Sequence, residues 1–287
     1  SDNSVITEAK AGGAATGGSG VGIGGAVGIS VANNETRAEL GSGGLQTVTG
    51  HLRATATHTG STLTSADGSA GGESAGIGIA LGLNIVTDST LATTERDIVA
   101  GGDVMFAAHA SGASSAGAKA SATGGKEEDS SDPDKDKGVD KKVGAERGLA
   151  DKKAGETGTK GTGDAKDTPA AETSGGGVSA AAAVGVNIAG SKAQAYIPAG
   201  GKVTSGGLLT LSTSNNTDAT AKADGSATSG TNEDGSNRTN VGVGIAINVV
   251  SALNQATIGT GSTIQAKFLT LEAKRTEVAG DTVGTIG

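Results

Sequence analysis

The sequence predicts an all-β repeat fold: a β-solenoid of about four units that carries one charged loop insertion. Three observations predict it. Glycine makes up 52 of the 287 residues, about 18% against a usual share of roughly 7%. Large apolar residues alternate with glycine or alanine over long stretches, and a period of two is typical of β-strands. The alternating run also recurs four times, which is the signature of a repeat architecture.

The four alternating runs share one register. They read GVGIGGAVGISV from Gly20, AGIGIALGLNIV from Ala75, VSAAAAVGVNIA from Val178 and VGVGIAINVV from Val241. Aligning the polar residue near the end of each run places together Ser30, Asn84, Asn187 and Asn248, which are 54, 103 and 61 residues apart. An insertion in the third unit explains the long second spacing.

Each run is followed by the same order of elements. A turn leads to an Ala-x-Ile or Ala-x-Leu strand, and a glycine turn then leads to a short apolar strand and a polar strand rich in Thr, Ser, Ala and Asp. We therefore expect four strands of ordinary length in a unit of about 55 to 60 residues. The units span residues 1–58, 59–110, 111–214 and 215–274, and residues 275–287 begin a fifth.

Alternation gives each long run one bulky face and one bare face. In the second run the bulky residues are Ala75, Ile77, Ile79, Leu81, Leu83 and Ile85, and the small or polar ones are Gly76, Gly78, Ala80, Gly82 and Asn84. We expect stacked units to bury the Val/Ile/Leu face in a continuous core. The bare face allows the close approach of another sheet or of the surrounding chain. The recurring asparagines are expected near one corner, stacked as a ladder or bonded to turn amides.

These repeats resemble the Ala/Gly-rich repeats of giant secreted bacterial adhesins, of the filamentous-haemagglutinin-like and leukotoxin-like filamentous adhesin kind. The matching features are the GVGIAINVV-type run and the glycine-turn segments that follow it, such as IVAGGDVMFAAHA and IPAGGKVTSGGLLTLSTS. The resemblance covers nearly the whole chain outside the insertion. It implies a secreted β-helical stalk and carries over no catalytic residue. Because the sequence shows no secretion domain or anchoring motif, we expect a middle piece of a longer array.

The insertion, residues 126–172, holds 13 acidic and 10 basic residues between glycine-rich flanks. Such a composition predicts a solvated surface loop. Alternate aspartates offer a second interpretation, because they could supply oxygen ligands to Ca²⁺; they are Asp132, Asp134, Asp136 and Asp140. Lys137 stands where an EF-hand loop has glycine, and Val143 stands where it has glutamate. We expect no other cofactor.

Other apparent motifs have simpler explanations. Gly20, Gly22 and Gly25 match G-x-G-x-x-G, but they lie in a strand run with no βαβ context. The three histidines are expected to be exposed on strands, with His51 and His109 on equivalent rungs of neighbouring units. A row of T-x-T from Thr55 to Thr64 suggests a flat threonine face, although only one unit has it.

The net charge of −8 argues against nucleic acid as a partner, since phosphates would be repelled. No stretch is long and apolar enough for a membrane helix. The absence of cysteine is compatible with an extracellular bacterial protein.

The function expected from the sequence is that of a structural stalk or filament segment of a secreted or surface-displayed bacterial adhesin, and not of an enzyme. It would mediate attachment, cell-cell contact or matrix assembly outside the cell. Its partners would be other repeats of the same chain, together with a surface polysaccharide or a host or matrix receptor. The alternative is a β-helical carbohydrate-active enzyme or a glycan-binding module, which usually relies on clustered acids and aromatic platforms. The only aromatic residues are Phe106, Tyr196 and Phe268.

Overall fold

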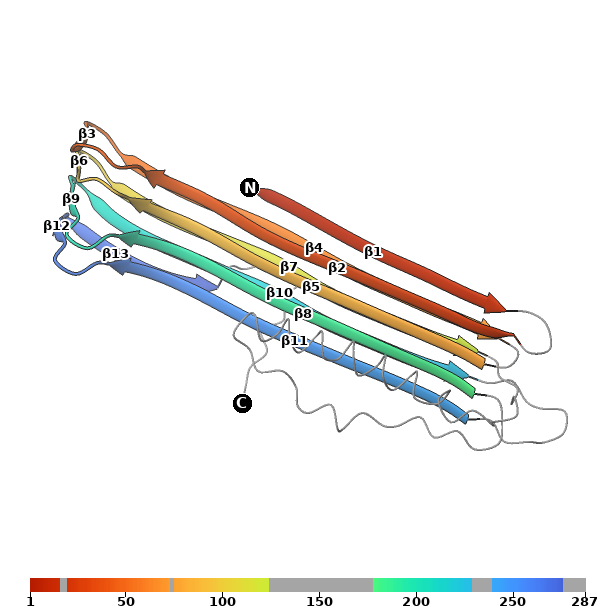
Figure 1. The fold of residues 1–287 in the computed structure, drawn as a ribbon. Coiled ribbons are helices and arrows are strands. Elements are labelled where there is room, and N and C mark those ends of the chain that lie inside the picture. The colour runs from red at the N-terminus through yellow and green to blue at the C-terminus, as the bar shows by residue number, and fades with distance from the viewer. Residues whose placement is uncertain (16–19, 73–74, 124–177, 229–238, 276–287) are drawn as a thin grey trace, which may run out of the picture.

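The computed structural model describes residues 1–15, 20–72, 75–123, 178–228 and 239–275. These residues form thirteen β-strands and no helix (Figure 1). Every strand pairing is parallel. The predicted all-β fold of stacked, solenoid-like repeats is therefore confirmed.

The strands form three sheets. Sheet A contains, in spatial order, β1 (Asp2–Ala15), β4 (Leu52–Gly72), β7 (Val104–Thr123), β10 (Leu208–Thr228) and β13 (Phe268–Arg275). Sheet B contains β11 (Thr239–Ile258), β8 (Val178–Ile197), β5 (Ala75–Thr94) and β2 (Val21–Leu40). Sheet C contains β12 (Thr263–Gln265), β9 (Lys202–Ser205), β6 (Ile98–Ala100) and β3 (Gln46–Val48). One coil passes once through sheets B, C and A, so β2–β3–β4 is coil 1 and β11–β12–β13 is coil 4.

The register of sheet B follows the repeat read from the sequence. Ser30 pairs with Asn84, Asn84 with Asn187, and Asn187 with Asn248. The predicted alignment of the four runs and their spacings is therefore confirmed.

Coils 1 to 3 each have two long strands and one short strand, rather than the four strands of ordinary length expected. The long run and the Ala-x-Ile segment after it form one strand of 20 residues in sheet B. The short apolar strand and the polar strand likewise form one strand of 20 or 21 residues in sheet A in coils 1 to 3. The alternation continues across the expected breaks, and no residue there forces a turn.

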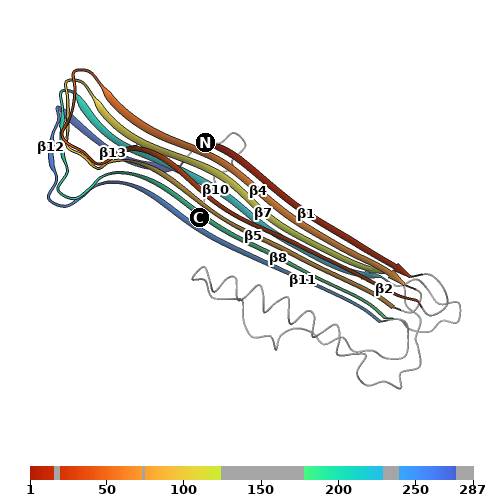
Figure 2. The same cartoon turned by 45° about the horizontal axis from the view of Figure 1, so that its top comes forward.

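Sheets A and B lie face to face with their strands running in opposite directions, and sheet C closes one end of each coil (Figures 1 and 2). Near sheet C the interior is three-sided and filled by large apolar side chains. Phe106 is its largest member and is fully buried. The cluster around it contains Ile98, Val104, Ile197, Val203, Leu209 and Leu211. We call this region the aliphatic end.

In the other half of each coil, sheets A and B touch through glycine and alanine, and we call this region the Gly/Ala half. A Cβ added to Gly28 would lie 2.8 Å from the carbonyl oxygen of Ser65 on the facing sheet. One added to Gly76 would lie 2.7 Å from the carbonyl oxygen of Thr123. Real Cβ atoms do not come this close to backbone, so glycine is required by the close approach of the two sheets. The bare face therefore meets another sheet, which was one of the two possibilities expected.

This arrangement overturns the prediction that the Val/Ile/Leu face of the long runs fills the space between the stacked sheets. Part of that face is nevertheless buried on the outer side of sheet B, where Leu81, Leu83, Val184 and Val186 belong to a separate cluster. In β2 the inward-pointing residues are small, namely Gly22, Gly24, Ala26, Gly28, Ser30 and Ala32, whereas Ile23 and Val31 point outward and are 53% and 66% exposed. The physical reason is space: two backbones this close leave room for a hydrogen atom or a methyl group only. The large side chains must then take the outer face.

Positive φ accounts for few of the glycines. Gly200 and Gly261 have φ of 76° and 72° and occupy equivalent turns before β9 and β12. Glycine enters this left-handed region at little steric expense.

Candidate functional site

An asparagine ladder crosses the interior at the middle of sheet B. Asn84 Nδ2 donates to Asn187 Oδ1, and Asn187 Nδ2 donates to Asn248 Oδ1, both at 3.0 Å. Ser114 and Thr64 of sheet A donate to the same ladder at 2.5 and 3.2 Å. The predicted ladder is therefore present, but its place was wrong. Each asparagine is the tenth of twenty residues in its strand, so the ladder lies at mid-strand and not at a corner.

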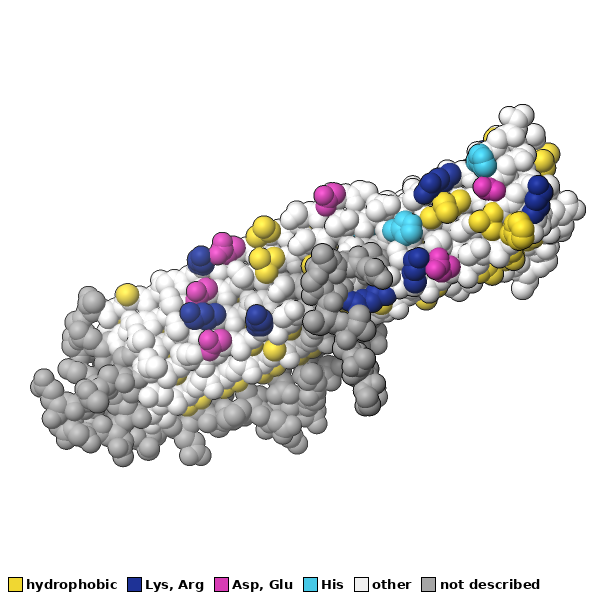
Figure 3. All heavy atoms as spheres, turned by 180° about the vertical axis from the view of Figure 1, so that it is seen from behind, with side chains coloured by type: hydrophobic (Ala, Val, Ile, Leu, Met, Phe, Trp, Pro, Cys, Tyr) yellow, Lys and Arg dark blue, Asp and Glu magenta, His cyan; other side chains and the backbone are white. Residues whose placement is uncertain are grey.

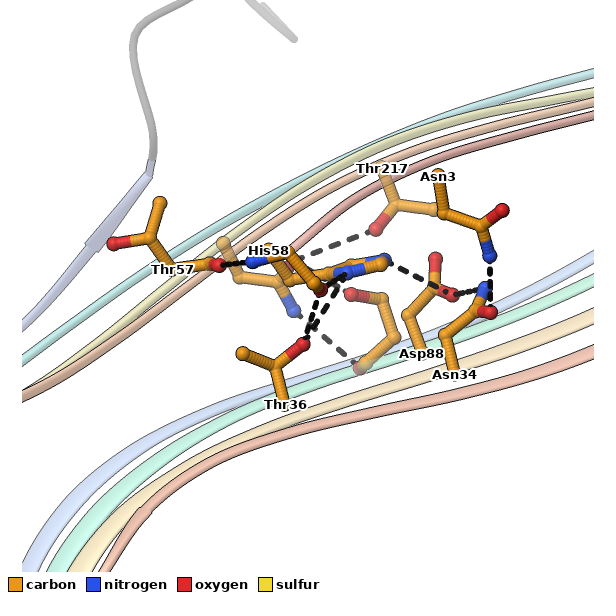
Figure 4. A network of polar contacts seen from close by, with 10 residues as sticks. Asn3, Asn34, Thr36, Thr57, His58, Asp88 and Thr217 are labelled. Atoms are coloured by element: carbon orange, nitrogen blue, oxygen red, sulfur yellow. Dashed lines mark hydrogen bonds and ion pairs between the residues drawn. The ribbon is translucent and has the colours of Figure 1, made fainter.

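Beside the ladder, coils 1 and 2 are joined by a buried polar network (Figure 4). His58 Nε2 of β4 lies 3.3 Å from Asp88 Oδ1 of β5. Asn34 Nδ2 donates to the same carboxylate oxygen at 2.7 Å, and Asn34 accepts a hydrogen bond from Asn3. His58 Nδ1 lies 2.9 Å from Ser1 Oγ. His58 is 1% exposed and Asp88 is 5% exposed.

Two glycines of sheet A make room for this pair. A Cβ added to Gly60 would lie 2.8 Å from His58 Nε2, and one added to Gly112 would lie 3.2 Å from Asp88 Oδ2. In coil 3 the same level of the stack holds the smaller pair Ser191 and Asn215, joined at 2.8 Å. Because His58 and Asp88 are both enclosed, a dissolved substrate does not reach them in this structure. Their chemistry is to join neighbouring coils, and removal of one partner would leave a buried polar group or charge uncompensated.

The outer face of sheet A is polar and carries a ladder of alternating charge (Figure 3). Lys10 pairs with Asp67, Asp67 with Lys119, and Lys119 with Asp224, so the sign changes at every strand. Opposite charges on directly paired residues favour this register over a slipped one. Lys10 Nζ also lies 2.7 Å from Glu8 Oε1. The hydrogen bond and charge of Glu8, with a smaller contribution from Asp67, raise the pKa of Lys10.

The outer face of sheet B is apolar, and we call it the apolar face. It comprises six in-register positions on each of four strands: Val21, Ile23, Gly25, Val27, Ile29 and Val31 of β2; Ala75, Ile77, Ile79, Leu81, Leu83 and Ile85 of β5; Val178, Ala180, Ala182, Val184, Val186 and Ile188 of β8; and Thr239, Val241, Val243, Ile245, Ile247 and Val249 of β11. None of these residues is charged.

The exposure of the apolar face differs from strand to strand. The five large side chains of β2 are between 48% and 66% exposed. On β5 and β8, Leu81 and Val184 are buried. The open part of the face is therefore the β2 row, which we define as the six β2 positions from Val21 to Val31.

The histidine predictions were largely wrong. His58 faces the interior and not the solvent. His51 precedes β4 and accepts a hydrogen bond from the Asp103 backbone at 2.9 Å, whereas His109 lies within β7 and pairs with Thr57 and Ser214, so His51 and His109 are not equivalent. His109 Nδ1 lies 2.8 Å from Ser214 Oγ. Burial lowers the pKa of His109, and the charges of Lys274 and Arg53 lower it further.

The threonine row is also divided by the structure. Thr55, Thr57 and Thr59 point outward from β4, whereas Thr62 and Thr64 point inward and are buried. The alternation along β4 is unbroken, but Thr59 and Thr62 are three positions apart and therefore lie on opposite faces. A continuous flat threonine face is therefore absent from β4. Gly22 and Gly25 lie within β2, as expected for a chance match to the dinucleotide motif.

The predicted calcium ligands Asp132, Asp134, Asp136 and Asp140 lie outside the described residues, as does the whole insertion 126–172. Among the residues that the structure does describe, no group of three or more His, Cys, Asp or Glu side chains is placed to hold a metal ion. The described part of the chain also contains no helix able to span a membrane.

Comparisons with protein-family models, with curated proteins and with solved structures find no match to this chain.

Proposed function

We propose that this chain is a structural segment of a stalk or filament of a secreted or surface-displayed bacterial adhesin. The observation that carries the proposal is the unbroken stacking of coils 1 to 4, in which each long strand pairs in register with its counterpart in the next coil. A fold of this kind lengthens by adding coils, without any change in its cross-section.

Three interior features support a mechanical role. The Gly/Ala half brings two backbones into direct contact, so the sheets cannot slide without a clash. The asparagine ladder adds side-chain hydrogen bonds along the stacking direction. The His58–Asp88 network adds another link between coils 1 and 2. Each ties one coil to its neighbours or to the opposite sheet.

The resemblance to Ala/Gly-rich adhesin repeats supports the remaining parts of the proposal. These are an extracellular location, a role in attachment, cell-cell contact or matrix assembly, and partners such as a surface polysaccharide or a host or matrix receptor. The polar outer face of sheet A suits an aqueous environment.

Tandem copies of the coils test the stalk role. Proteins with one, two and three copies of residues 2–275 would be measured by small-angle scattering and electron microscopy, because Asp2 follows Arg275 in the register of sheet A. Each added coil should lengthen the particle by about 4.8 Å, the spacing of neighbouring strands, at constant width. Particles that instead grow as flexibly linked globules would contradict the proposal.

The surface location has its own test. Protease treatment of intact cells that express the parent protein, followed by detection with an antibody against these coils, should remove the signal. Signal that survives until the cells are lysed would contradict surface display. The open reading frame of the full-length protein should encode many further units and a secretion domain.

The calcium proposal for Asp132, Asp134, Asp136 and Asp140 remains open and is tested by thermal unfolding with and without EGTA. Binding predicts a lower midpoint in EGTA, restored by added Ca²⁺. The matched control replaces the four aspartates by asparagine, which should abolish any effect of EGTA. An unchanged midpoint in the unmodified protein would argue against a stabilising ion.

A further inference from the structure

We propose that the apolar face over β5, β8 and β11 is the docking site of this chain's own charged insertion, residues 126–172. The inference goes beyond the stalk role, which does not depend on what lies against sheet B. It also restricts the prediction of a solvated loop to the charged remainder of the insertion. It starts from aliphatic side chains that are buried although they point away from the interior of the coil.

One row of the apolar face shows this burial most clearly. Its four members are in-register neighbours across sheet B: Ile29, Leu83, Val186 and Ile247. Their exposed fractions are 49%, 1%, 0% and 6% in that order. Ile29 and Ile247 lie on the two edge strands, and the same side chain at the same level of opposite edges should be equally exposed on a bare sheet. A segment therefore lies over the row from β11 to β5 and stops before β2.

The strands that the structure describes do not supply this segment. Strands β5 and β8 pack against their neighbours in sheet B and against sheet A, which lies on the inner side (Figures 1 and 2). The cluster that contains Leu83 and Val186 has all its members on the outer side of sheet B. Side chains stand roughly perpendicular to a sheet, so neighbours in the same sheet shield their flanks and leave their tips open. The segment against the tips must come from outside the described residues.

Composition and position select the insertion among the segments outside the described residues. Residues 16–19, 73–74 and 229–238 contain no Val, Ile, Leu, Met or aromatic side chain. Residues 276–287 do contain aliphatic side chains, but they follow β13 in sheet A, on the opposite side of the coil. Residues 124–177 remain, and they are by far the longest of these segments.

The insertion is connected directly to the apolar face. It follows β7 and leads into Val178, which is the first residue of β8 and a position of that face. Its only large aliphatic residues lie close together in the sequence: Val139, Val143 and Leu149. An extended chain spans about 3.3 Å per residue, so the residues between Leu149 and Val178 can easily reach back along β8 to Val186. Contact with the apolar face removes these aliphatic side chains from water.

Thiol reactivity tests the docking, because the chain has no cysteine of its own. Leu83→Cys places a single thiol at a position that is 1% exposed, and it should react slowly with a maleimide in the full chain. A variant that also carries Val139→Ser, Val143→Ser and Leu149→Ser keeps the length and charge of the insertion. In that variant the thiol should react about tenfold faster, because burial protects a group only while the docked segment stays in place. An unchanged rate would overturn the proposal.

The matched control changes three threonines of the same insertion. Thr157→Ser, Thr159→Ser and Thr162→Ser together should leave the reactivity of the thiol at position 83 unchanged. Ser30→Cys points into the coil and should stay protected with either insertion, which checks that the fold persists. Val186→Cys replaces Leu83→Cys if that protein fails to fold.

Photo-cross-linking identifies the docked segment independently. Benzoylphenylalanine in place of Leu149 should cross-link to β5, β8 or β11, as read by mass spectrometry of the peptides. Cross-links confined to sheet A would overturn the proposal. Removal of residues 276–287 should leave the thiol at position 83 protected; exposure there, together with protection in the triple serine variant, would assign the docking site to the C-terminal residues instead. None of these results would alter the tandem-copy test of the stalk role.

Discussion

At the end closed by sheet C the interior is filled by large aliphatic side chains, whereas in the other half sheets A and B touch through glycine and alanine. The same strands pass through both regions. In the aliphatic end the third sheet holds A and B apart, and the space is filled by Phe106 and its neighbours. In the Gly/Ala half no third sheet intervenes, and the large side chains of sheet B lie outside. The width of the interior therefore decides which face of an alternating strand points into the coil.

Truncation of the largest core residue should produce the largest effect. Phe106→Ala removes a fully buried ring from the aliphatic end and should lower the free energy of unfolding by about 3–5 kcal/mol. Phe268→Ala is the matched control, because Phe268 is exposed on β13 and its loss should change stability by less than about 0.5 kcal/mol. Urea unfolding measures both. Similar effects at the two positions would mean that the aliphatic end is not a packed core.

The Gly/Ala half should be destabilised by substitutions that add atoms rather than by substitutions that remove them. Gly24→Ala places a methyl group against the backbone of Ser69 on the facing sheet and should destabilise by about 3 kcal/mol, the upper end of the usual range for overpacking.

The next residue, Gly25, supplies the control. It points outward with open space around it, so Gly25→Ala should be neutral or slightly stabilising. Chemical denaturation of the two variants compares faces that differ by one position. Tolerance at Gly24 with sensitivity at Gly25 would reverse the assignment of inside and outside.

The boundary between the two regions is polar and contains the asparagine ladder. Breaking this ladder should have an intermediate effect on stability. Asn187→Ala breaks bonds to Asn84, Asn248 and Ser114, and should lower the free energy of unfolding by about 1–3 kcal/mol because buried partners lose hydrogen bonds. The control is Gln194→Ala, since Gln194 bonds Gln255 in an exposed position and its removal should change stability by less than about 0.5 kcal/mol. Equal thermal midpoints for the two variants would show that the buried ladder adds nothing.

The smallest effect concerns pH. The pKa of His109 is lowered by burial and by nearby cations, so the native state binds its proton less readily than the unfolded state. Its contribution to stability is therefore complete above the ordinary histidine pKa of about 6.5 and is lost as pH falls through the lowered value. The change should be below roughly 0.5 kcal/mol, since the ring is partly exposed and screened. Thermal midpoints at pH 7.5 and pH 5 should differ less in His109→Gln than in the unmodified protein; an identical difference would exclude His109 as the cause.

The sequence was sufficient for the repeat and its register, because Ser30, Asn84, Asn187 and Asn248 occupy the same position in each alternating run. It also indicated close packing at the glycines. It did not reveal which face lies inside. Alternation defines two faces, and hydrophobicity alone favoured placing the bulkier face inside. The distance between sheets A and B decides otherwise, and that distance is set by strands that are far apart in the sequence.

The buried His58–Asp88 network was missed for a related reason. A histidine in a threonine-rich strand reads as exposed until the facing strand is known. A signal was available in the alternation, because His58 shares its parity with Thr62, Thr64 and Ala66, which all point inward. Asp88, at the position equivalent to Asn34, marks the same polar level in sheet B. Only the pairing of the two sheets brings these residues together.

The reactivity of two adjacent positions in β2 tests the central claim most directly. In the cysteine-free chain, Ile29→Cys and Ser30→Cys introduce single thiols at residues that are 49% and 4% exposed. With small side chains inside and large ones outside, the thiol at position 29 should react rapidly with a maleimide in the native state. The thiol at position 30 should react only after unfolding. Rapid reaction at position 30 with protection at position 29 would contradict the account and return the Val/Ile/Leu face to the core.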